Sequence, residues 1–241
     1  MIISTNDYCN TMDRGFQFFC TQIGMPALPT LRLGSPFDFE KQVSLVMIQG
    51  APAPEQKDSE LRPFYTAMLR RYLDETNGGA FVLFTSYQLL KRTAADMTAW
   101  LTERNMPLFV QGEGMPRSEM VRQFKEQNNA VLFGTDSFWQ GVDVPGQALR
   151  NVIVTKLPFL VPTDPIVEAK QELIKKRGGN PFRDYQLPAA ILKFKQGFGR
   201  LIRTKTDTGL IVVLDPRIHT KPYGRQFLDA LPKCRIRYDK Y

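Results

Sequence analysis

Short apolar runs rich in β-branched residues alternate with longer amphipathic stretches along this chain. Such alternation is typical of a mainly parallel sheet covered by helices on both faces. Strands are expected at Val43–Ile48, Ala80–Thr85, Leu108–Gln111, Ala130–Gly134, Asn151–Lys156 and Leu210–Leu214. Helices are expected at Glu60–Glu75, Tyr87–Arg104, Ser118–Glu126, Pro165–Lys176, Pro188–Ile202 and Tyr223–Leu231. The pattern therefore predicts one α/β domain.

The segment before about Leu31 is less regular than the rest. Its Phe16, Phe18 and Phe19 suggest a short amphipathic helix that docks on a neighbouring element. We therefore expect residues 1–30 to be a connecting segment and residues 31–241 to form the domain.

The composition is that of a soluble globular protein with a basic balance. Hydrophobic residues make up 43% and charged residues 23% of the 241 residues, which is enough to bury one substantial core. An excess of 32 Lys and Arg over 24 Asp and Glu gives a net charge of +8. This charge suits a polyanionic partner such as nucleic acid, although charge alone does not decide it.

Targeting and metal-binding patterns do not stand out in the sequence. The beginning does not resemble a signal peptide, and no apolar run is long enough to span a bilayer, so we expect no membrane partner. Cys9, Cys20 and Cys234 are too few and too widely spaced for a disulfide framework or for a zinc or iron–sulfur ligand set. His219, the single histidine, is expected to be a surface or packing residue. These features fit a reducing cytoplasm.

The segment that is most informative about chemistry runs from Gln196 to Arg203, QGFGRLIR. It falls at the end of the helix predicted from Pro188, and Gln196, Arg200 and Arg203 are spaced so that they share one helical face. Gly197 and Gly199 cost helix stability, so the sequence favours close backbone approach or room for a ligand there. Two arginines one turn apart can hold the charge that develops on a transferring γ-phosphoryl group. The alternative interpretation is a solvated basic helix face.

A second segment, VLFGTDSFWQGVDVPG, begins at Val131 and ends at Gly146. An apolar strand runs into a polar turn here, and ligands of open α/β sheets bind at the carboxyl ends of strands. Thr135 and Ser137 offer hydroxyls for phosphate contacts. An ordinary strand-to-helix loop with a capping side chain explains the same residues.

In a third segment, starting at Gly78, a buried strand ends in Thr85, Ser86 and Tyr87. Two hydroxyls and an aromatic ring can contact a nucleic-acid phosphate and stack on a base. Core packing and a helix N-cap account for them equally well.

In this order and spacing, the three segments resemble motifs IV, V and VI of superfamily 2 helicases. Their sequences are most similar to the DinG/XPD branch. The phrases FWQGVDVPG and GFGRLIRTKTDTG, the strand ending LDPR and the stretch LGSPFD carry the resemblance, which covers roughly residues 31–232. The resemblance implies a RecA-like three-layer sandwich. It makes residues 31–241 the second RecA-like domain of an ATP-dependent DNA helicase that moves 5′→3′ on single-stranded DNA.

The resemblance also implies a role for individual residues. Arg200 and Arg203 would act as arginine fingers on ATP, and Gln196 would order them. Gln140 and Asp143 would line the nucleotide cleft. The strand of DNA would touch Thr85, Ser86, Tyr87 and Thr135. Trp139 is interpreted as a core anchor rather than a DNA contact.

The chain departs from the family pattern because it has no G-x-x-x-x-G-K-[ST] loop and not even one Gly-Lys dipeptide. ATP with Mg²⁺ is therefore expected to bind jointly with an N-terminal RecA-like domain, and the iron–sulfur cluster of many relatives is not expected in this chain. Two other hypotheses remain open: a non-enzymatic nucleic-acid-binding module with a helicase-like fold, and a stand-alone nucleotide-binding enzyme.

Overall fold

The main body of the chain is a seven-stranded sheet in which every pairing is parallel. The structure is a computed structural model that describes residues 2–4, 20, 23–25, 30–32, 35–139, 144 and 146–241. The strand order is β5-β6-β4-β7-β8-β3-β9. The strands are β3 (Val43–Gln49), β4 (Ala80–Leu83), β5 (Leu108–Val110), β6 (Val131–Gly134), β7 (Asn151–Val154), β8 (Gly209–Val213) and β9 (Arg235–Lys240). The six predicted strands are confirmed.

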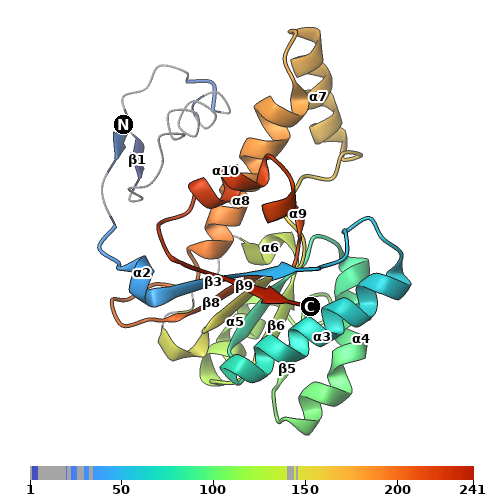
Figure 1. Cartoon of the computed structure of the whole chain (residues 1–241), viewed down its shortest axis with the longest axis vertical. Coiled ribbons are helices and arrows are strands. Elements are labelled where there is room, and N and C mark those ends of the chain that lie inside the picture. The colour runs from blue at the N-terminus through green and yellow to red at the C-terminus, as the bar shows by residue number, and fades with distance from the viewer. Residues whose placement is uncertain are drawn as a thin grey trace.

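Helices cover both faces of the sheet, which makes three layers (Figure 1). The helices are α2 (Phe39–Gln42), α3 (Asp58–Thr76), α4 (Tyr87–Glu103), α5 (Arg117–Glu126), α6 (Asp136–Trp139), α7 (Pro165–Lys176), α8 (Leu187–Phe198), α9 (Arg217–Thr220) and α10 (Gly224–Asp229). On one face lie α3 and α4, and on the other lie α5, α6, α8, α9 and α10. The remaining long helix, α7, projects away from the sheet (Figure 1). Within the described ranges, no helix has the length and apolar character needed to cross a membrane.

The two faces of each strand feed two separate cores. On β4, Phe81 and Leu83 pack with α5, α6 and α8, whereas Ala80 and Val82 pack with α3 and α4. Side chains alternate between the faces of a strand, so a strand buried on both sides is mainly apolar, and a polar residue in it must hydrogen-bond, as Asn151 of β7 does to the Tyr72 carbonyl at 2.9 Å. Burying each of the larger side chains contributes about 1.5–3 kcal/mol. This explains why continuous apolar runs predicted the strands.

A small parallel pair, β1 (Ile2–Ser4) with β2 (Thr30–Arg32), lies apart from the main sheet. The helix predicted around Phe16, Phe18 and Phe19 falls outside the described residues. The boundary between a connecting segment and the domain at residue 30 therefore stays a prediction.

Before α8 the backbone makes a π-helical turn, η2 (Phe182–Gln186). Pro188 follows in the first turn of α8. A proline lacks the N–H of an α-helical bond, and its ring crowds the carbonyl four residues earlier. The wider π turn relieves that crowding, and it is a local feature that the apolar pattern does not encode.

The edge strand β9 was not predicted, because four of its six residues are charged and it has no apolar run. It pairs with β3 along its whole length. Asp239 accepts a hydrogen bond from Tyr72 Oη at 2.8 Å, and Arg237 pairs with Glu75 at 3.0 Å, so β9 is attached to α3. Burial, together with this bond to Asp239, raises the pKa of the Tyr72 hydroxyl. Charged residues on an edge strand also discourage pairing with other chains.

Gly78 is the glycine that the fold needs most clearly. It follows α3 in the left-handed region at φ +65°, and a Cβ built there would lie 2.0 Å from the carbonyl oxygen of Asn129. We predict that Gly78→Ala destabilises the chain by about 1–2 kcal/mol through the left-handed backbone and by about 1–3 kcal/mol more through the clash. Urea unfolding followed by circular dichroism measures the loss.

Gly178→Ala is the matched control. Gly178 has φ +75°, and a Cβ there would meet no atom within 4 Å. Its substitution retains the backbone strain and the same change in the unfolded chain, but it adds no clash. Equal losses in the two variants would contradict the role given to the Asn129 carbonyl.

Candidate functional site

The QGFGRLIR segment begins on α8 but leaves the helix before its first arginine. The helix ends at Phe198, and Gly199 forms its C-cap at φ −66° and ψ 0°. The predicted helix to Ile202, with Gln196, Arg200 and Arg203 on one face, is therefore wrong. Gln196 is exposed on the last turn of α8, whereas both arginines lie in the loop that leads to β8. Leu201 and Ile202 are both buried in the core, so these two side chains anchor the loop to the domain.

Gly197 brings the backbone of α8 close to the indole of Trp139, as the paired glycines suggested. A Cβ at Gly197 would lie 3.0 Å from Cε3 and Cζ3 of Trp139. Trp139 is fully buried, so its interpretation as a core anchor is confirmed. A Cβ at Gly199 would meet nothing nearer than 3.4 Å. Only the first of the two glycines is therefore required for close approach.

Arg200 is a buried residue that joins the end of α8 to the end of α6. It is 5% exposed, and its Nε and Nη2 donate to the carbonyl oxygen of Trp139 at 3.2 and 2.7 Å. A buried guanidinium needs such acceptors, because leaving its donors unpaired is costly. The segment that follows Trp139 contains Gln140 and Asp143, which lie outside the described residues. Arg200 is thus placed next to the start of that segment in the chain.

Arg203 differs from Arg200 in that its side chain is exposed, while its backbone is held by Asp207. The Oδ2 of Asp207 accepts from the N–H groups of Arg203 and Thr204, both at 2.8 Å. Its Oδ1 accepts from the Thr204 hydroxyl at 2.7 Å. Gln42, at the end of α2, donates to the carbonyls of Thr204 and Asp207 at 2.9 and 2.8 Å. The loop that carries Arg203 is therefore fixed from two sides.

The carboxylate of Asp207 is stabilised in its ionised form. Its burial, with 8% exposure, acts to raise the pKa, but the hydrogen bonds from Thr204 and from the backbone of Arg203 outweigh it, so the pKa of Asp207 is lowered. Neither Asp207 nor Gln42 was predicted as a site residue. Asp207 sits four residues after Arg203, and the Thr-x-Thr-Asp sequence that ends with it is the local signal that could have identified it.

The hydroxyl-bearing residues gather at the carboxyl ends of β4 and β6, which are neighbours in the sheet. Ser86 caps α4 by accepting from the N–H of Leu89 at 3.3 Å, so its capping interpretation is confirmed. Thr85 is half-buried, and Tyr87 is 48% exposed. Thr135 is 5% exposed and hydrogen-bonds to the side chain of Gln111. The edge therefore presents Tyr87 and Ser86 more openly than Thr135.

The structure does not bring the two groups of residues together. Gln42 directly precedes β3 and holds the Arg203 loop, which directly precedes β8, so this group lies at the amino ends of strands. Thr85 and Thr135 follow β4 and β6, so they lie at the carboxyl ends. Strands of a parallel sheet share one direction, and the two groups therefore occupy opposite edges.

The LDPR stretch, which follows β8, forms an ion pair between buried Asp215 and half-buried Arg217. Asp215 is 1% exposed, accepts from the backbone N–H of Leu157 at 2.8 Å and pairs with Arg217 at 2.7 Å. It thereby ties the segment after β7 to the segment after β8. His219 packs edge-on against Tyr238, and its burial lowers its pKa, which agrees with its expected packing role. Among the residues the structure describes, no three His, Cys, Asp or Glu side chains cluster as metal ligands would.

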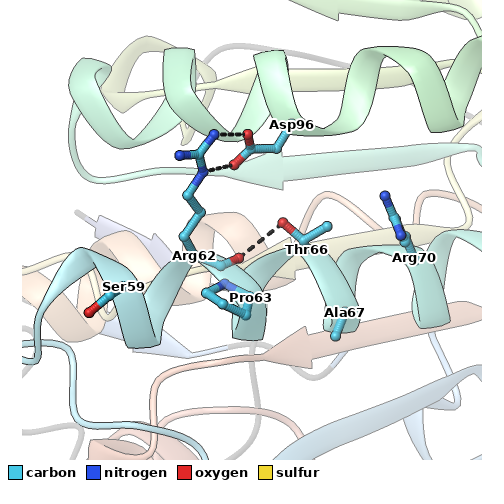
Figure 2. A pocket seen from close by; sticks show the side chains of 7 residues that line it. All are labelled: Ser59, Arg62, Pro63, Thr66, Ala67, Arg70 and Asp96. Carbon is cyan, nitrogen blue, oxygen red and sulfur yellow. Dashed lines mark hydrogen bonds and ion pairs between the residues drawn. The ribbon is translucent and has the colours of Figure 1, made fainter.

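A shallow pocket lies between α3 and α4, away from these residues (Figure 2). Arg62 reaches across it to Asp96, and Thr66 donates to the Arg62 carbonyl at 3.0 Å. The lining residues are Ser59, Arg62, Pro63, Thr66, Ala67, Arg70 and Asp96. The pocket contains none of the predicted site residues.

The sequence model of the helicase C-terminal domain family matches residues 69–234. This chain belongs to the helicase C-terminal domain family. It is 40% identical over 214 residues to the ATP-dependent DNA helicase YoaA of Escherichia coli, covering 89% of this chain and 33% of the relative. It is 37% identical over 235 residues to the 3′-5′ exonuclease DinG of Bacillus subtilis, covering 94% of this chain and 25% of the relative. This helicase domain thus spans a quarter to a third of the length of these relatives.

The fold of this helicase domain is similar to that of a solved XPD helicase. The TM-score is 0.67 at 16% identity, over 92% of this chain and 40% of the other. The expected RecA-like architecture and the resemblance to the DinG/XPD branch are both confirmed.

The contact between α8 and Trp139 yields the first prediction about the site. We expect Gly197→Ala to be less stable than Gly199→Ala by about 1–3 kcal/mol, because only the first methyl group would press on a buried ring. Both substitutions restrict the unfolded chain in the same way. The gain in helix propensity belongs to Gly197→Ala alone, because Gly199 lies outside α8, and this gain opposes the predicted loss. Urea midpoints measure the effect. Indistinguishable variants would contradict it.

The carboxylate of Asp207 yields the second prediction about the site. Its lowered pKa means that its stabilising effect is complete above its unfolded-state pKa and is lost as pH falls through its folded-state pKa. We expect Asp207→Asn to unfold more readily by about 1.5–3 kcal/mol near neutral pH, and we expect this difference to shrink below about pH 4. Glu113→Gln, at an exposed loop position, controls for the loss of one carboxylate. A difference that persists unchanged at low pH would count against the ionised Asp207.

Proposed function

We propose that this chain is the C-terminal motor domain of a longer ATP-dependent DNA helicase that moves 5′→3′ on single-stranded DNA. One observation carries the proposal: an exposed arginine, Arg203, stands on a loop fixed by buried Asp207 and Gln42. A surface arginine without a task needs no such support. A charge that must meet a developing phosphoryl charge needs a fixed backbone, because preorganisation is what makes the interaction effective.

Within this proposal, the two arginines have unequal parts. Arg203 is the arginine finger, since its exposed guanidinium can reach a nucleotide that another domain presents. Arg200 also belongs to the nucleotide side of the domain, where its bonds to the Trp139 carbonyl hold the end of α6. Gln140, Asp143 and exposed Gln196 line the same cleft in the proposed motor. The described side chains of this group suit an anion, because they are cationic or neutral amides.

ATP with Mg²⁺ would bind jointly with an N-terminal RecA-like domain. The sequence has no phosphate-binding loop, whose backbone N–H groups would cradle the phosphates. The metal nucleotide supplies the phosphoryl group and neutralises part of its charge when it is bound. From this chain, Arg203 contributes a positive charge from the far side of the cleft. The similarity to a relative named as an ATP-dependent DNA helicase supports this division.

The DNA would run along the carboxyl edge of the sheet, where Thr85, Ser86, Tyr87 and Thr135 lie. The exposed ring of Tyr87 suits a base, and the hydroxyls suit phosphate oxygens. The net charge of +8 favours a polyanion at long range. A reducing cytoplasm belongs to the same proposal, since Cys20 and Cys234 are unpaired and burial raises the pKa of the Cys234 thiol to about 11.

The arginine finger is tested by Arg203→Ala in the full-length helicase. We expect the DNA-stimulated ATPase to fall on the order of 10³-fold in kcat, because a positive charge is removed from the transition state. The KM for DNA should change little, since Arg203 lies at the edge opposite the DNA. Lys205→Ala is the matched control, because Lys205 is an exposed cation of the same loop.

Three outcomes decide the proposal. Full activity of Arg203→Ala would exclude the finger role. A loss of DNA binding with unchanged ATP turnover would favour the non-enzymatic nucleic-acid-binding module. The chain by itself should show no ATP hydrolysis, with or without single-stranded DNA, and turnover by the isolated chain would show that it holds a complete nucleotide site.

A further inference from the structure

Gln111 lies at the centre of the hydrogen bonds at the carboxyl edge. Neither its residue type nor its position in the sequence indicates this role. It follows β5, and its backbone N–H donates to the Phe133 carbonyl of β6 at 3.0 Å. Its side chain reaches the end of β6 and the start of α4, where it contacts Thr135, Ser137 and Tyr87. One amide thus connects the ends of three consecutive strand–helix units.

The direction of these hydrogen bonds is fixed by one of them. The backbone N–H of Thr135 can only donate, and its acceptor at 2.7 Å is Oε1 of Gln111. The amide oxygen therefore faces Thr135, and the amide nitrogen faces the other way. Nε2 carries two protons, and it donates to the hydroxyl oxygens of Tyr87 and of Ser137, the latter at 3.0 Å.

This arrangement sets the protons of three hydroxyls. The Thr135 hydroxyl donates inward to Oε1 of Gln111 at 3.0 Å, and the residue is 5% exposed. The hydroxyls of Tyr87 and Ser137 each accept from Nε2, so their own protons are directed away from Gln111. Both of these residues are exposed. The protons of the Tyr87 and Ser137 hydroxyls are consequently available to a partner other than Gln111, and the Thr135 proton is not.

The ring of Tyr87 is also held in place. Gly112 follows Gln111 at φ +91°, and a Cβ built on it would lie 3.5 Å from Cε1 of Tyr87. The glycine turn after β5 therefore passes directly beside the ring. A phosphate oxygen only accepts hydrogen bonds, and two neighbouring hydroxyls whose protons are not used by Gln111 match that requirement.

We propose that Gln111 is a positioning residue that presents the hydroxyls of Tyr87 and Ser137 as paired donors to a phosphate of single-stranded DNA. Thr135 then supports the edge from within, and Ser137 makes the phosphate contact. This inference rests on the proposed function, because it specifies how the DNA edge of the motor grips the backbone. Gln111 acts through the two hydroxyls and does not touch the DNA itself.

The test measures binding of this chain to a fluorescein-labelled oligothymidylate by fluorescence anisotropy at several salt concentrations. The double variant Tyr87→Phe/Ser137→Ala removes both donors at exposed positions and leaves the core untouched. We expect its affinity to fall about 10- to 100-fold, as for hydrogen bonds to charged groups. The slope of log K against log salt should not change, because no cation is removed. Gln88→Met, an exposed neighbour of Tyr87, is the control and should bind as the unchanged chain does.

Gln111→Met separates positioning from a purely structural role. It should weaken binding in the unchanged chain and have no further effect in the Tyr87→Phe/Ser137→Ala background, because the groups through which it acts are gone. Equal weakening in both backgrounds would overturn the positioning role. If Gln111→Met unfolds, the double variant still decides whether the two hydroxyls grip DNA.

The outcomes also separate this inference from the proposed function. An unchanged chain that shows no salt-dependent binding to oligothymidylate would contradict the DNA edge as a whole. An unchanged chain that binds, together with a double variant that binds equally well, would overturn the role of Gln111 and its two hydroxyls while leaving the helicase assignment in place.

Discussion

The burial of both sheet faces is the constraint from which the rest of this domain follows. All four residues of β4, of β6 and of β7 are buried, and the side chains above and below each strand enter different cores. Such strands leave no room for a polar functional side chain within the sheet. Polar chemistry is therefore confined to the ends of the strands, where loops meet water. Both the hydroxyl-lined edge and the arginine loop obey this rule.

At those ends, function depends on short polar residues that fix the backbone. Asp207 and Gln42 do not carry the charge that the proposed motor would use, but without them the Arg203 loop would lose most of its described side-chain hydrogen bonds to the protein. Gln111 has the same relation to Tyr87 and Ser137. In each case an amide or carboxylate satisfies buried N–H or C=O groups, and it thereby orients a neighbour that stays exposed.

The sequence predicted what depends on local pattern, and it did not predict what depends on distant partners. Apolar runs located the six predicted strands, and the paired glycines indicated the close approach of Gly197 to Trp139. The end of α8 was placed too late because Leu201 and Ile202 continue an apolar pattern although Gly199 ends the helix. β9 was missed because it has no apolar run. Ion pairs to α3, rather than burial of apolar side chains, attach it to the domain. Gln42 lies 162 residues before Thr204, and no local pattern reveals that bond.

The same packing connects the hydroxyl-lined edge to the arginine loop. Thr135 ends the hydroxyl edge, and α6 begins with the next residue and runs to Trp139. Trp139 packs on Gly197 and gives its carbonyl to Arg200, whose loop continues to Arg203 and Asp207. A single four-residue helix therefore separates the nucleic-acid side from the nucleotide side of the proposed motor. Because Trp139 is fully buried, α6 packs closely against the segment that contains Gly197 and Arg200. Close packing at Trp139 thus connects the two edges through α6.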